Sequence, residues 1–578
     1  MSEALLKVHS NISPITKSML IGSLGVTAGF FDETNLAQFF TSKLPKLGPH
    51  VKIQNGQIIQ SLVMQFLNVP HQSLYGTAEF FTNIAIGALL NAAVTEEDLG
   101  RAVISRTLDN VSAYGSEKLF IETSAYIIKQ LGVEVTEAHL DSTSIHYHGE
   151  SQPSKNLDFV LARGYSRDDK SDLKQANVLA IVDAFTKLPI YERNVSGNVS
   201  DNKSFNELFT KGGLDLLKEQ FTNIKYLVAD SAACTSDIVN NADGKVFLVT
   251  RVPDKLTAVK DVYKSLDKTT LTDVYPNDPD SPKGKWIENI KIGDHELKCM
   301  VVCNENLKGR KEITIAKKAD KELDALTKAI KKLRTQPCKC QADAEASIQK
   351  LINSCQYCTI TNVAYEEVKK ATTRGRSKKG EEREMTVVAV KATATVAIAP
   401  ILVSKKVDEE ILYVIGTTDT SRNWTMDQLL ATYKRQSTVE RAWRCCKDPK
   451  FFIDSLYLES PERIDALLWI MMIALLVYSA IEYKPRATMK AKSLTLPAPD
   501  KKSEQDQPTM MRFLQYLSNA NINLIYRGLS NIEVSYIPNE LIYILNAFGG
   551  KYCKYFNADT YLAYMQNEKA IRAFNRSL

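Results

Sequence analysis

The chain has 578 residues, of which 44% are hydrophobic and 24% charged, and its formal net charge is +6. This length suits a soluble globular protein of roughly three or four domains, and the mildly basic balance is compatible with nucleic acid without requiring it. The stretch MSEALLKVHS has no basic segment followed by an apolar core, so we expect no secretory signal peptide.

Residues 1–125 carry apolar residues at helical spacing, in segments such as NGQIIQSLVMQFLN and TEEDLGRAVISRTLDN. Nothing in this region has the pattern of a catalytic site. We therefore expect a helical N-terminal region that binds DNA or packs against the rest of the chain.

The pattern of apolar and polar residues changes over residues 126–253, and it predicts the first part of an α/β core. Four segments read as strands, the second of them as two strands joined by a short turn: VEVTEAHLDSTSIHYHGE, ANVLAIVDAFTKLPIYERNV, IKYLVADSAA and KVFLVTRVP. The segment SFNELFTKGGLDLLKEQF reads as an amphipathic helix. This order predicts a mixed sheet covered by helices.

Asp141 lies in the first of these strands, where side chains alternate between the two faces. Thr143 therefore shares a face with Asp141, whereas His146 and His148 share the opposite face. The His-x-His pair cannot join Asp141 at a metal site unless a bulge intervenes. We therefore interpret both histidines as facing solvent or nucleic acid.

Asp230 ends a different apolar strand, LVAD. In open α/β sheets, ligands bind at the carboxyl ends of the strands, which makes this carboxylate a candidate site residue. The alternative is that a strand-ending Asp only caps the next turn. The residue alone does not decide between the two.

From about residue 254 to residue 408, a large insertion interrupts the core. Short strands lie around KWIENIKIGDHELKCMVVCN, and a lysine-rich helix lies near 319–334. The basic loop KKATTRGRSKKGEERE and the strands in MTVVAVKATATVAIAPILV follow. We expect the core to resume at residue 409, because ILYVIGTT reads as a returning strand.

Ten cysteines without a secretion signal indicate reduced thiols in a cytoplasm. Cys338 and Cys340 precede Cys355 and Cys358 by about fifteen residues, which leaves zinc as an alternative. However, C-x-C is a less usual half-site than C-x-x-C. The intervening QADAEASIQKLINS reads as a helix with a buried face, so we favour plain buried thiols.

A helix near residues 425–447 presents a polar stripe. Thr425 to Gln428 form a capping-box pattern, and Leu429 and Leu430 belong to a face that packs. At about 100° per residue, five side chains fall near one line along the helix: Tyr433, Gln436, Glu440, Arg444 and Lys447. A solvated face with i,i+4 charge pairs is the alternative, but the clean start and the packed faces favour a stripe that looks into a site.

Asp141, Asp230 and Glu440 would come from two strands and one helix. Three such acids could hold two Mg²⁺ ions about 3.5 to 4 Å apart. Mg²⁺ prefers oxygen ligands and commonly shares them with substrate phosphates. The polar neighbours of Glu440 would then lie where phosphates approach.

The region after residue 450 is expected to be helical. The run ALLWIMMIALLVYSAI, residues 466–481, is shorter than the roughly twenty residues that span a bilayer. It therefore predicts a buried core helix and no membrane partner. The core would end at residue 483, and a polar, proline-containing linker near 484–508 would open a helical C-terminal region, residues 484–578.

Six segments occur in the order found in DDE transposases of bacterial insertion sequences: HLDSTSIHYHGE, ARGYSRDDKSDLKQ, VSGNVSDNKSF, LVADSAA, FLVTRVP and YKRQSTVERAWRCCKDPKFF. The chain resembles the branch with a β-rich insertion between the second Asp and the Glu, and with a Y-R-E-K signature on the Glu helix. The resemblance is strong over about 134–480 and looser before it. It implies an α/β, ribonuclease-H-like core between helical terminal regions.

Carried over by position, the resemblance implies a catalytic and metal-binding triad of Asp141, Asp230 and Glu440. It also implies a set of side chains that hold the DNA backbone: Tyr433, Gln436, Arg444 and Lys447. Gln436 stands where the signature has Arg, which puts a bidentate phosphate contact in doubt. Arg435 or Arg444 could compensate.

The resemblance further implies cut-and-paste transposition of double-stranded DNA, commonly through a hairpin on the transposon end. The partners would be terminal inverted repeats, target DNA and a second copy of the chain in a synaptic complex. The cofactor would be two Mg²⁺ ions, for which Mn²⁺ can substitute. Further candidate DNA contacts are Trp286 for a base held out of the stack, Arg374 and Arg376 in RGRSKK for a narrow minor groove, and Arg251.

Alternatives stay open for these assignments. Trp286 could be an ordinary sheet-packing residue, and RGRSKK could be a disordered basic loop. The whole chain could be a domesticated copy that binds DNA without cutting, for which Gln436 argues and against which the triad argues. It could also be a metal-dependent nuclease of the same fold without strand transfer.

Overall fold

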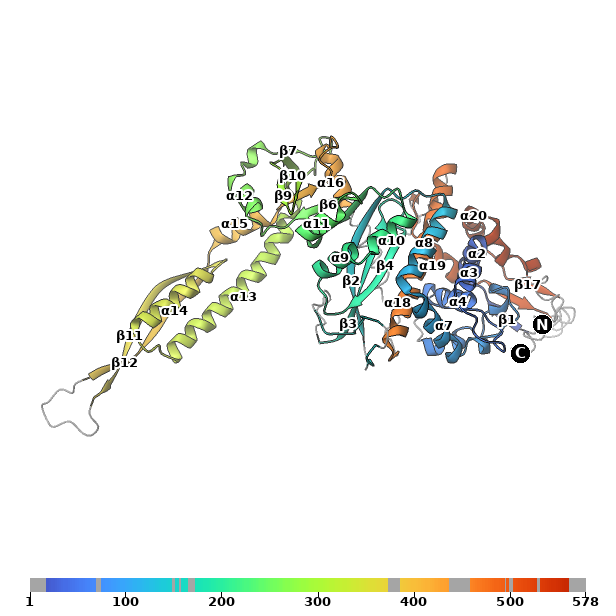
Figure 1. Cartoon of the computed structure of the whole chain (residues 1–578), viewed down its shortest axis with the longest axis horizontal. Helices are drawn as coiled ribbons and strands as arrows, with labels where there is room; N and C mark the ends of the chain where they lie inside the picture. The colour runs from blue at the N-terminus through green and yellow to red at the C-terminus, as the bar shows by residue number, and fades with distance from the viewer. Residues whose placement is uncertain are drawn as a thin grey trace, which may run out of the picture. The chain divides into compact units, whose positions relative to one another are not determined.

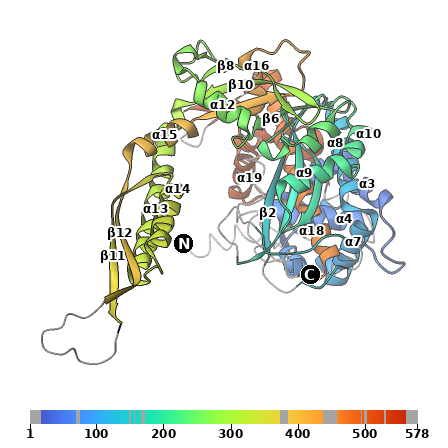
Figure 2. The same cartoon turned by 60° about the vertical axis from the view of Figure 1, so that its left-hand side comes forward.

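The computed structural model describes residues 17–68, 74–147, 151–154, 157–164, 172–372, 385–435, 458–493, 495–497, 503–527 and 531–560. The chain forms two compact units, which appear in Figures 1 and 2. Unit 1 comprises Met1–Thr250, Ile292–His295 and Ala431–Leu578, and unit 2 comprises Arg251–Lys291 and Glu296–Leu430.

The N-terminal part of unit 1 is helical, as its sequence indicates. Its helices are α2 (Leu24–Thr34), α3 (Leu36–Lys43), α4 (Asn55–Leu67), α5 (Thr77–Phe80), α6 (Ile86–Leu89), α7 (Arg101–Tyr114) and α8 (Ser116–Leu131). α4 is buried along its length except at Gln57. A helix buried on every side belongs to the core of a large domain, so this region packs; its assignment to DNA binding stays a prediction.

The central helix of unit 1 is α18 (Pro461–Lys492), which contacts α4, α7, α8 and strand β4 (Pro189–Ser196). α18 is long and apolar enough to cross a membrane, but its apolar window is 94% buried inside the protein. The Trp469 ring is fully buried and meets the edge of the Phe40 ring, with centroids 5.5 Å apart. The apolar run at 466–481 is therefore a core helix, as predicted.

The linker expected from residue 484 is wrong over its first part, because α18 continues through Pro485 to Lys492. A proline inside a helix removes one backbone hydrogen bond and strains the preceding turn. Ion pairs on both sides of it compensate: Lys484 pairs with Glu33, and Arg486 pairs with Glu482.

The core sheet of unit 1 contains β4, β3 (Lys174–Asp183), β2 (Glu137–Tyr147), β5 (Tyr226–Ala229) and β6 (Phe247–Val252), in that spatial order. β2, β3 and β4 form an antiparallel meander, whereas β5 and β6 run parallel to β2. The helices α9 (Asp201–Thr210), α10 (Gly213–Gln220) and α11 (Ser236–Ala242) connect them. Three antiparallel strands followed by two strands parallel to the first make a ribonuclease-H-like sheet, which confirms the expected fold class.

Segments from both terminal regions share a small sheet in unit 1. β1 (Lys17–Leu20) pairs with β16 (Asn523–Tyr526), and β16 pairs with β17 (Ile532–Val534). Outside this small sheet, the C-terminal region also contains β14 (Leu496–Pro497), β15 (Glu504–Gln505), α19 (Met510–Asn519), α20 (Asn539–Phe548) and α21 (Gly550–Cys553). The expectation of purely helical termini was incomplete, because strands this short carry too little alternation to be read.

Unit 2 contains an antiparallel sheet with the strand order β13-β10-β8-β7, and β9 pairs with β10. Its strands are β7 (Thr272–Asp273), β8 (Lys283–Trp286), β9 (Ile290–Ile292), β10 (His295–Cys303) and β13 (Leu412–Thr417). α12 (Thr257–Ser265) precedes the sheet in the chain. The returning strand expected at ILYVIGTT is therefore present as β13.

The rest of unit 2 is a long hairpin backed by helices. β11 (Cys358–Ala371) pairs with β12 (Met385–Ile398), and α13 (Lys308–Thr335) and α14 (Gln341–Ser354) contact the hairpin. Its small core contains Ala344, Ile348, Val390 and Ala392. Figures 1 and 2 show α13 beside the hairpin, and α15 (Pro400–Glu410) leads on to β13. The lysine-rich helix expected at 319–334 is present but begins earlier, at Lys308.

Candidate active site

Asp141 lies in the middle of β2, on a strand that is buried or half-buried along its length. β2 pairs with β3 without a register shift from Ala138 to Tyr147, so the alternation of faces is unbroken. Asp141 is half-buried, and its Oδ1 accepts the backbone N–H of Ser142 at 2.8 Å. Because no bulge intervenes between them, His146 lies on the opposite face, as the alternation predicts; His148 lies outside the described residues.

Asp230 directly follows β5 and keeps an extended backbone, with φ −71° and ψ −177°. Its Oδ1 accepts the backbone N–H of Ala232 at 2.9 Å and so caps the short helix η3 (Ser231–Ala233). Its carbonyl oxygen accepts the Thr250 hydroxyl at 2.7 Å. Asp230 therefore does cap the next turn, and these bonds also fix the position of its backbone at the end of β5.

The register of β2 and β5 brings the two aspartates together. The parallel pair matches Ala138 with Leu227 and His139 with Val228. Two residues further along each strand, Asp141 and Asp230 stand at the same height with side chains on the same face. Neighbouring strands lie about 4.8 Å apart, so we expect the two carboxylates, which come from distant parts of the sequence, to lie close together where β5 ends.

The other face of β2 holds a different acid. The Ser142 hydroxyl points away from the Asp141 face and donates to Asp201 Oδ1 at 2.5 Å. Asp201 is the first residue of α9, so this bond ties the helix to the strand. Asp201 therefore has a structural role at the start of α9.

The helix that leads toward Glu440 is anchored on the Asp141 face of β2. α16 (Met426–Lys434) begins directly after Thr425, as the capping-box pattern predicts. Just beyond its end, Arg435 donates two hydrogen bonds to the Glu137 carboxylate, from Nε at 2.8 Å and from Nη2 at 2.7 Å. Glu137 and Asp141 are four residues apart on one strand and share a face. Arg435 therefore fixes the end of α16 against that face.

Glu137 is itself buried, with 6% of its surface exposed. Burial alone would raise the pKa of its carboxyl, but hydrogen bonds with His139 and Arg435 outweigh it, so the pKa lies below its ordinary value. The Arg435 guanidinium also lies 5.2 Å from the centre of the Phe185 ring. The sequence raised Arg435 as a substitute for the missing signature arginine, but its bidentate fork already holds Glu137.

Several predicted site residues lie outside the described residues: Gln436, Glu440, Arg444, Lys447, Arg374 and Arg376. Tyr433 is described and lies half-buried on α16. Among the residues that the structure describes, no three His, Cys, Asp or Glu side chains form a group that could hold a metal ion. Asp141 and Asp230 carry carboxylates, the ligand type that Mg²⁺ prefers, and their role as metal ligands stays a prediction.

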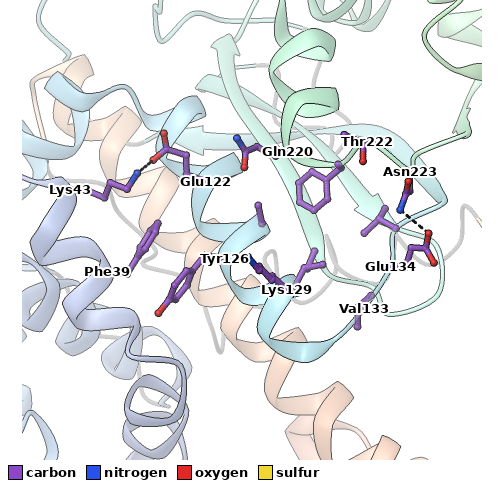
Figure 3. Close-up of a pocket in the computed structure, with 14 residues that line it drawn as sticks. Phe39, Lys43, Glu122, Tyr126, Lys129, Val133, Glu134, Gln220, Thr222 and Asn223 are labelled. Carbon is purple, nitrogen blue, oxygen red and sulfur yellow. Dashed lines mark hydrogen bonds and ion pairs between the residues drawn. The ribbon is translucent and has the colours of Figure 1, made fainter.

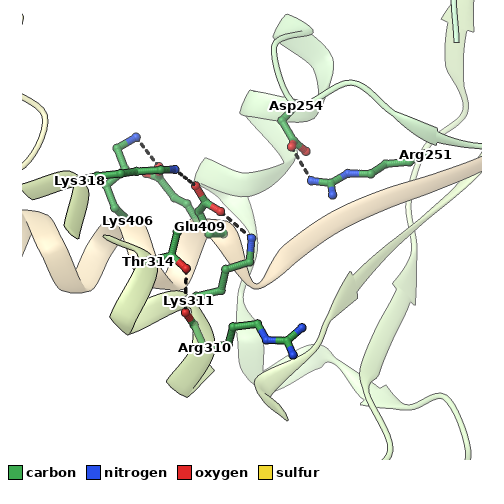
Figure 4. Close-up of polar contacts among 9 residues, drawn as sticks. Arg251, Asp254, Arg310, Lys311, Thr314, Lys318, Lys406 and Glu409 are labelled. Carbon is green, nitrogen blue, oxygen red and sulfur yellow. Dashed lines mark hydrogen bonds and ion pairs between the residues drawn. The ribbon is translucent and has the colours of Figure 1, made fainter. Parts of the chain in front are cut away.

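Two further candidates lie in unit 2. Arg251 pairs with Asp254 at 2.6 Å (Figure 4). The Arg251 guanidinium lies 5.7 Å from the centre of the Tyr413 ring. Trp286 is half-buried on β8, and the Lys298 ammonium lies 4.8 Å from the centre of its ring. The DNA-binding roles of both residues stay predictions, and one face of the Trp286 ring is already occupied by a cation.

The zinc alternative fails on geometry. All four cysteines at 338, 340, 355 and 358 lie in the part of the chain that the structure describes, and they form no metal-holding group there. The Cys355 thiol contacts the Leu351 carbonyl oxygen at 3.3 Å. Burial raises the pKa of the Cys358 thiol to about 11.

A cavity of about 810 Å³ in unit 1 lies near the N-terminal ends of β2 and β5. Its lining includes Phe39 and Tyr126, whose rings stack at 4.5 Å, and Val135, which precedes β2 (Figure 3). Its charged groups include Lys43, paired with Glu122 at 2.8 Å. Asp230 follows the C-terminal end of β5 and Asp141 lies in the middle of β2, whereas the cavity is lined by residues that precede both strands, so this cavity is not the candidate active site.

The family model described as "Transposase DDE domain" matches residues 138–477, more than half of the chain. This chain belongs to the DDE transposase family. A second model, described as a domain of unknown function (DUF4277), matches residues 16–125 of the transposase. Enzymes of this family cleave nucleic acid, and DDE domains generally use divalent metal ions.

Solved structures that are similar to the transposase include a cryo-EM structure of a piggyBac transposase synaptic complex with hairpin DNA. The identity is 10% and the TM-score 0.38, over 89% of this chain and 81% of that chain. A comparison with curated proteins finds no match.

Proposed function

We propose that this transposase cleaves double-stranded DNA at the terminal inverted repeats of its element and joins the resulting 3′-hydroxyl ends to target DNA. Asp141, Asp230 and Glu440 would hold two Mg²⁺ ions, for which Mn²⁺ can substitute. The main support is the register of β2 and β5, which aligns the first two carboxylates on one face of a core that belongs to the DDE family.

Glu440 can reach this pair from the position of Arg435. Asp141 is four residues beyond Glu137 on β2, a distance of about 13 Å at 3.3 Å per residue. Glu440 is five residues beyond Arg435. Five residues rise about 7.5 Å in the helix predicted over this stretch, to which the side chains add their own length, and they span up to about 17 Å when extended. Because Arg435 is bonded to Glu137, the chain that follows has the length needed to bring the third carboxylate beside Asp141.

The residues of this chain would position the DNA and balance its charge. Bound divalent ions would supply positive charge at the scissile phosphate and activate the attacking water. β2 and the end of β5 would hold the Asp141 and Asp230 carboxylates in fixed places, so little reorganisation would accompany the reaction. Four side chains would hold the DNA backbone without reading its sequence: Tyr433, Gln436, Arg444 and Lys447.

The complete reaction needs two copies of the chain. Each copy carries one triad and an element has two ends, so we propose a homodimer in the synaptic complex. We also propose that the freed end passes through a hairpin, with Trp286 as the candidate ring for the base that such a turn displaces. The eight cysteines that the structure describes are free thiols, which supports our placing of the enzyme in the cytoplasm.

The test uses the purified full chain and a DNA duplex that spans one boundary of the element. With Mg²⁺ we expect cleavage at the boundary, and with a target plasmid we expect joined products that carry the 3′ end of the element. Asp141→Asn, Asp230→Asn and Glu440→Gln should each lose both products. Glu219→Gln, an exposed acid on α10 in the same unit, is the matched control and should keep both.

The alternatives give different products. Cleavage without any joined product would make the chain a nuclease of this fold. Boundary-specific binding without cleavage would make it a DNA-binding copy. Full cleavage by Asp141→Asn and Glu440→Gln would show that the site has been assigned to the wrong residues.

A further inference from the structure

Helix α13 of unit 2 carries a continuous stripe of cations. Its 28 residues include ten Lys and Arg but four Asp and Glu. Ile315, Ala319, Leu326 and Ile330 are its buried residues, and they fall within about 60° of one another around the helix. Directly opposite them, five exposed cations fall within another sector of about 60°: Arg310, Lys317, Lys321, Lys328 and Lys332. We refer to these five residues as the α13 cation stripe.

The α13 cation stripe is not neutralised by neighbouring acids. Within the part of the chain that the structure describes, none of its five members has an ion-pair partner. The cations on the flank of the helix behave differently, because Lys311 and Lys318 both pair with Glu410, at 2.7 and 3.1 Å. Figure 4 shows these two lysines together, whereas the Arg310 side chain points away from them.

An acid of α13 that stands near the buried side is engaged with the hairpin. The Glu322 carboxylate accepts the backbone N–H groups of Gln356, Tyr357 and Cys358 at 2.7, 2.6 and 3.0 Å. The helix therefore uses an acid to hold the start of β11. The opposite, solvent-facing side is left with an excess of positive charge.

A helix that is merely solvated gains stability from opposite charges four residues apart. Two pairs of the α13 cation stripe have the reverse arrangement, because Lys317 and Lys321 are four residues apart, and so are Lys328 and Lys332; Asp324, four residues before Lys328, is the one acid of α13 at this spacing from a member of the stripe. Like charges at this spacing destabilise a helix. The arrangement therefore favours contact with an anionic partner over helix stability.

The geometry matches duplex DNA better than a membrane. From Arg310 to Lys332 the stripe is about 33 Å long at 1.5 Å per residue, close to one helical turn of DNA at about 34 Å. A membrane-surface helix presents an apolar face beside its cations. In α13 the apolar face is already buried against other elements of unit 2, which include β12 and α15.

We propose that the α13 cation stripe of unit 2 is a second DNA-binding surface, which contacts duplex phosphates without reading base sequence. This proposal rests on the proposed function only for its partner, DNA. Each phosphate that a cation neutralises contributes about −0.9 to the slope of log affinity against log salt concentration. Full engagement of the five cations would therefore account for a slope of about −4.5.

The test measures binding of the full chain to a 40-base-pair fluorescent duplex by anisotropy, at several salt concentrations and without divalent ions. One variant replaces Lys317, Lys321, Lys328 and Lys332 with Ala. The matched control replaces four exposed lysines of the same unit that lie outside the stripe, Lys255, Lys260, Lys350 and Lys405. Both variants remove the same charge, and both are first checked for an unchanged melting temperature.

We expect the stripe variant to bind at least tenfold more weakly in 100 mM salt and to lose about 3 to 4 from the slope. The slope of the control variant should fall by less than 1. Equal losses in both variants, or an unchanged slope in the stripe variant, would overturn the proposal. Asp324→Asn, which removes an acid beside the stripe, should tighten binding. Because no cleavage is required, a chain that does not cut DNA can still pass this test, and one that cuts can fail it.

Discussion

Unit 1 and unit 2 hold their charged residues in opposite ways. In unit 1 the acids that matter are buried or half-buried, and strand register or hydrogen bonds fix them, as for Asp141, Asp230 and Glu137. In unit 2 the cations of α13 are exposed on flexible stems. Shared metal ions demand carboxylates fixed within a few tenths of an ångström, whereas phosphates spread along a duplex tolerate mobile lysines. The difference predicts that single substitutions disable unit 1 and that only multiple substitutions disable unit 2.

The largest effect is expected at the paired aspartates. Asp141→Asn or Asp230→Asn keeps the side-chain shape but removes a charged metal ligand, so Mg²⁺-dependent cleavage should fall by at least about 1,000-fold. Chelation of divalent ions with EDTA should do the same to the unmodified enzyme. Gel assays of boundary cleavage measure both, with Glu219→Gln as the control. Activity within tenfold of the unmodified enzyme in either aspartate variant would contradict the claim that unit 1 depends on single, fixed carboxylates.

The second prediction compares an apolar residue in each unit. Trp469→Ala removes a fully buried ring from α18 and should lower the free energy of unfolding by about 3–5 kcal/mol. Ile313→Ala on α13 removes a side chain that is 63% exposed and should change it by less than about 0.5 kcal/mol. Urea denaturation followed by circular dichroism measures both. Similar losses at the two sites would contradict the burial of Trp469 in unit 1 and the exposure of Ile313 in unit 2.

The third prediction concerns Arg435, a positioning residue. Arg435→Gln leaves the buried Glu137 carboxylate without its bidentate partner, so α16 should lose its fixed place on β2. A displacement of about 1 Å at the reacting groups can cost about 100-fold in rate, and we expect a loss of 10- to 100-fold in single-turnover cleavage with DNA affinity unchanged. The double variant Arg435→Gln with Glu137→Gln should recover part of the loss. No recovery, together with weakened DNA binding, would instead make Arg435 a DNA ligand.

The fourth prediction is a pH dependence of stability. Glu192 is fully buried on β4, and its burial, followed by the carboxylates of Asp465 and Glu117, raises its pKa well above the ordinary value. Burial raises the pKa of Asp465 as well. An acid whose pKa is raised by folding makes its full contribution to the free energy of unfolding at low pH. This contribution is lost progressively as the pH rises above the pKa in the unfolded state, which is about 4.3 for Glu.

The neutral variant Glu192→Gln should therefore gain stability relative to the unmodified protein as the pH rises from 5 to 8. The gain per pH unit should approach about 1.4 kcal/mol while the folded group stays protonated. Denaturation midpoints across this range give the answer. A constant difference between the two proteins would mean that Glu192 ionises normally in the fold.

Much of the core sheet was predictable because its strands have local signatures. The alternation around Asp141 and the apolar run before Asp230 predicted two strands, and the alternation also predicted the face of β2 on which each side chain lies. The order of segments then implied the ribonuclease-H-like sheet. The position of Asp230 beside Asp141 follows from the register of β2 and β5, which no local pattern contains.

What the sequence could not provide depends on distant contacts. Arg435 and Glu137 are 298 positions apart, and their hydrogen bonds exist because α16 docks on β2. α18 continues past Pro485, and beside this proline Lys484 pairs with Glu33 of α2, a contact with a distant part of the chain. The five cations of α13 were visible as a lysine-rich helix, but the side that they share became clear only with its buried residues.

The central claim is that Asp141 and Asp230 bind divalent metal together. Electron paramagnetic resonance of Mn²⁺ titrated into the purified chain tests it most directly, because bound Mn²⁺ loses the six-line signal of the free ion. We predict saturable binding by the unmodified chain and by Glu219→Gln, and a loss of at least tenfold in affinity in both Asp141→Asn and Asp230→Asn. Undiminished Mn²⁺ binding in both aspartate variants would contradict the account.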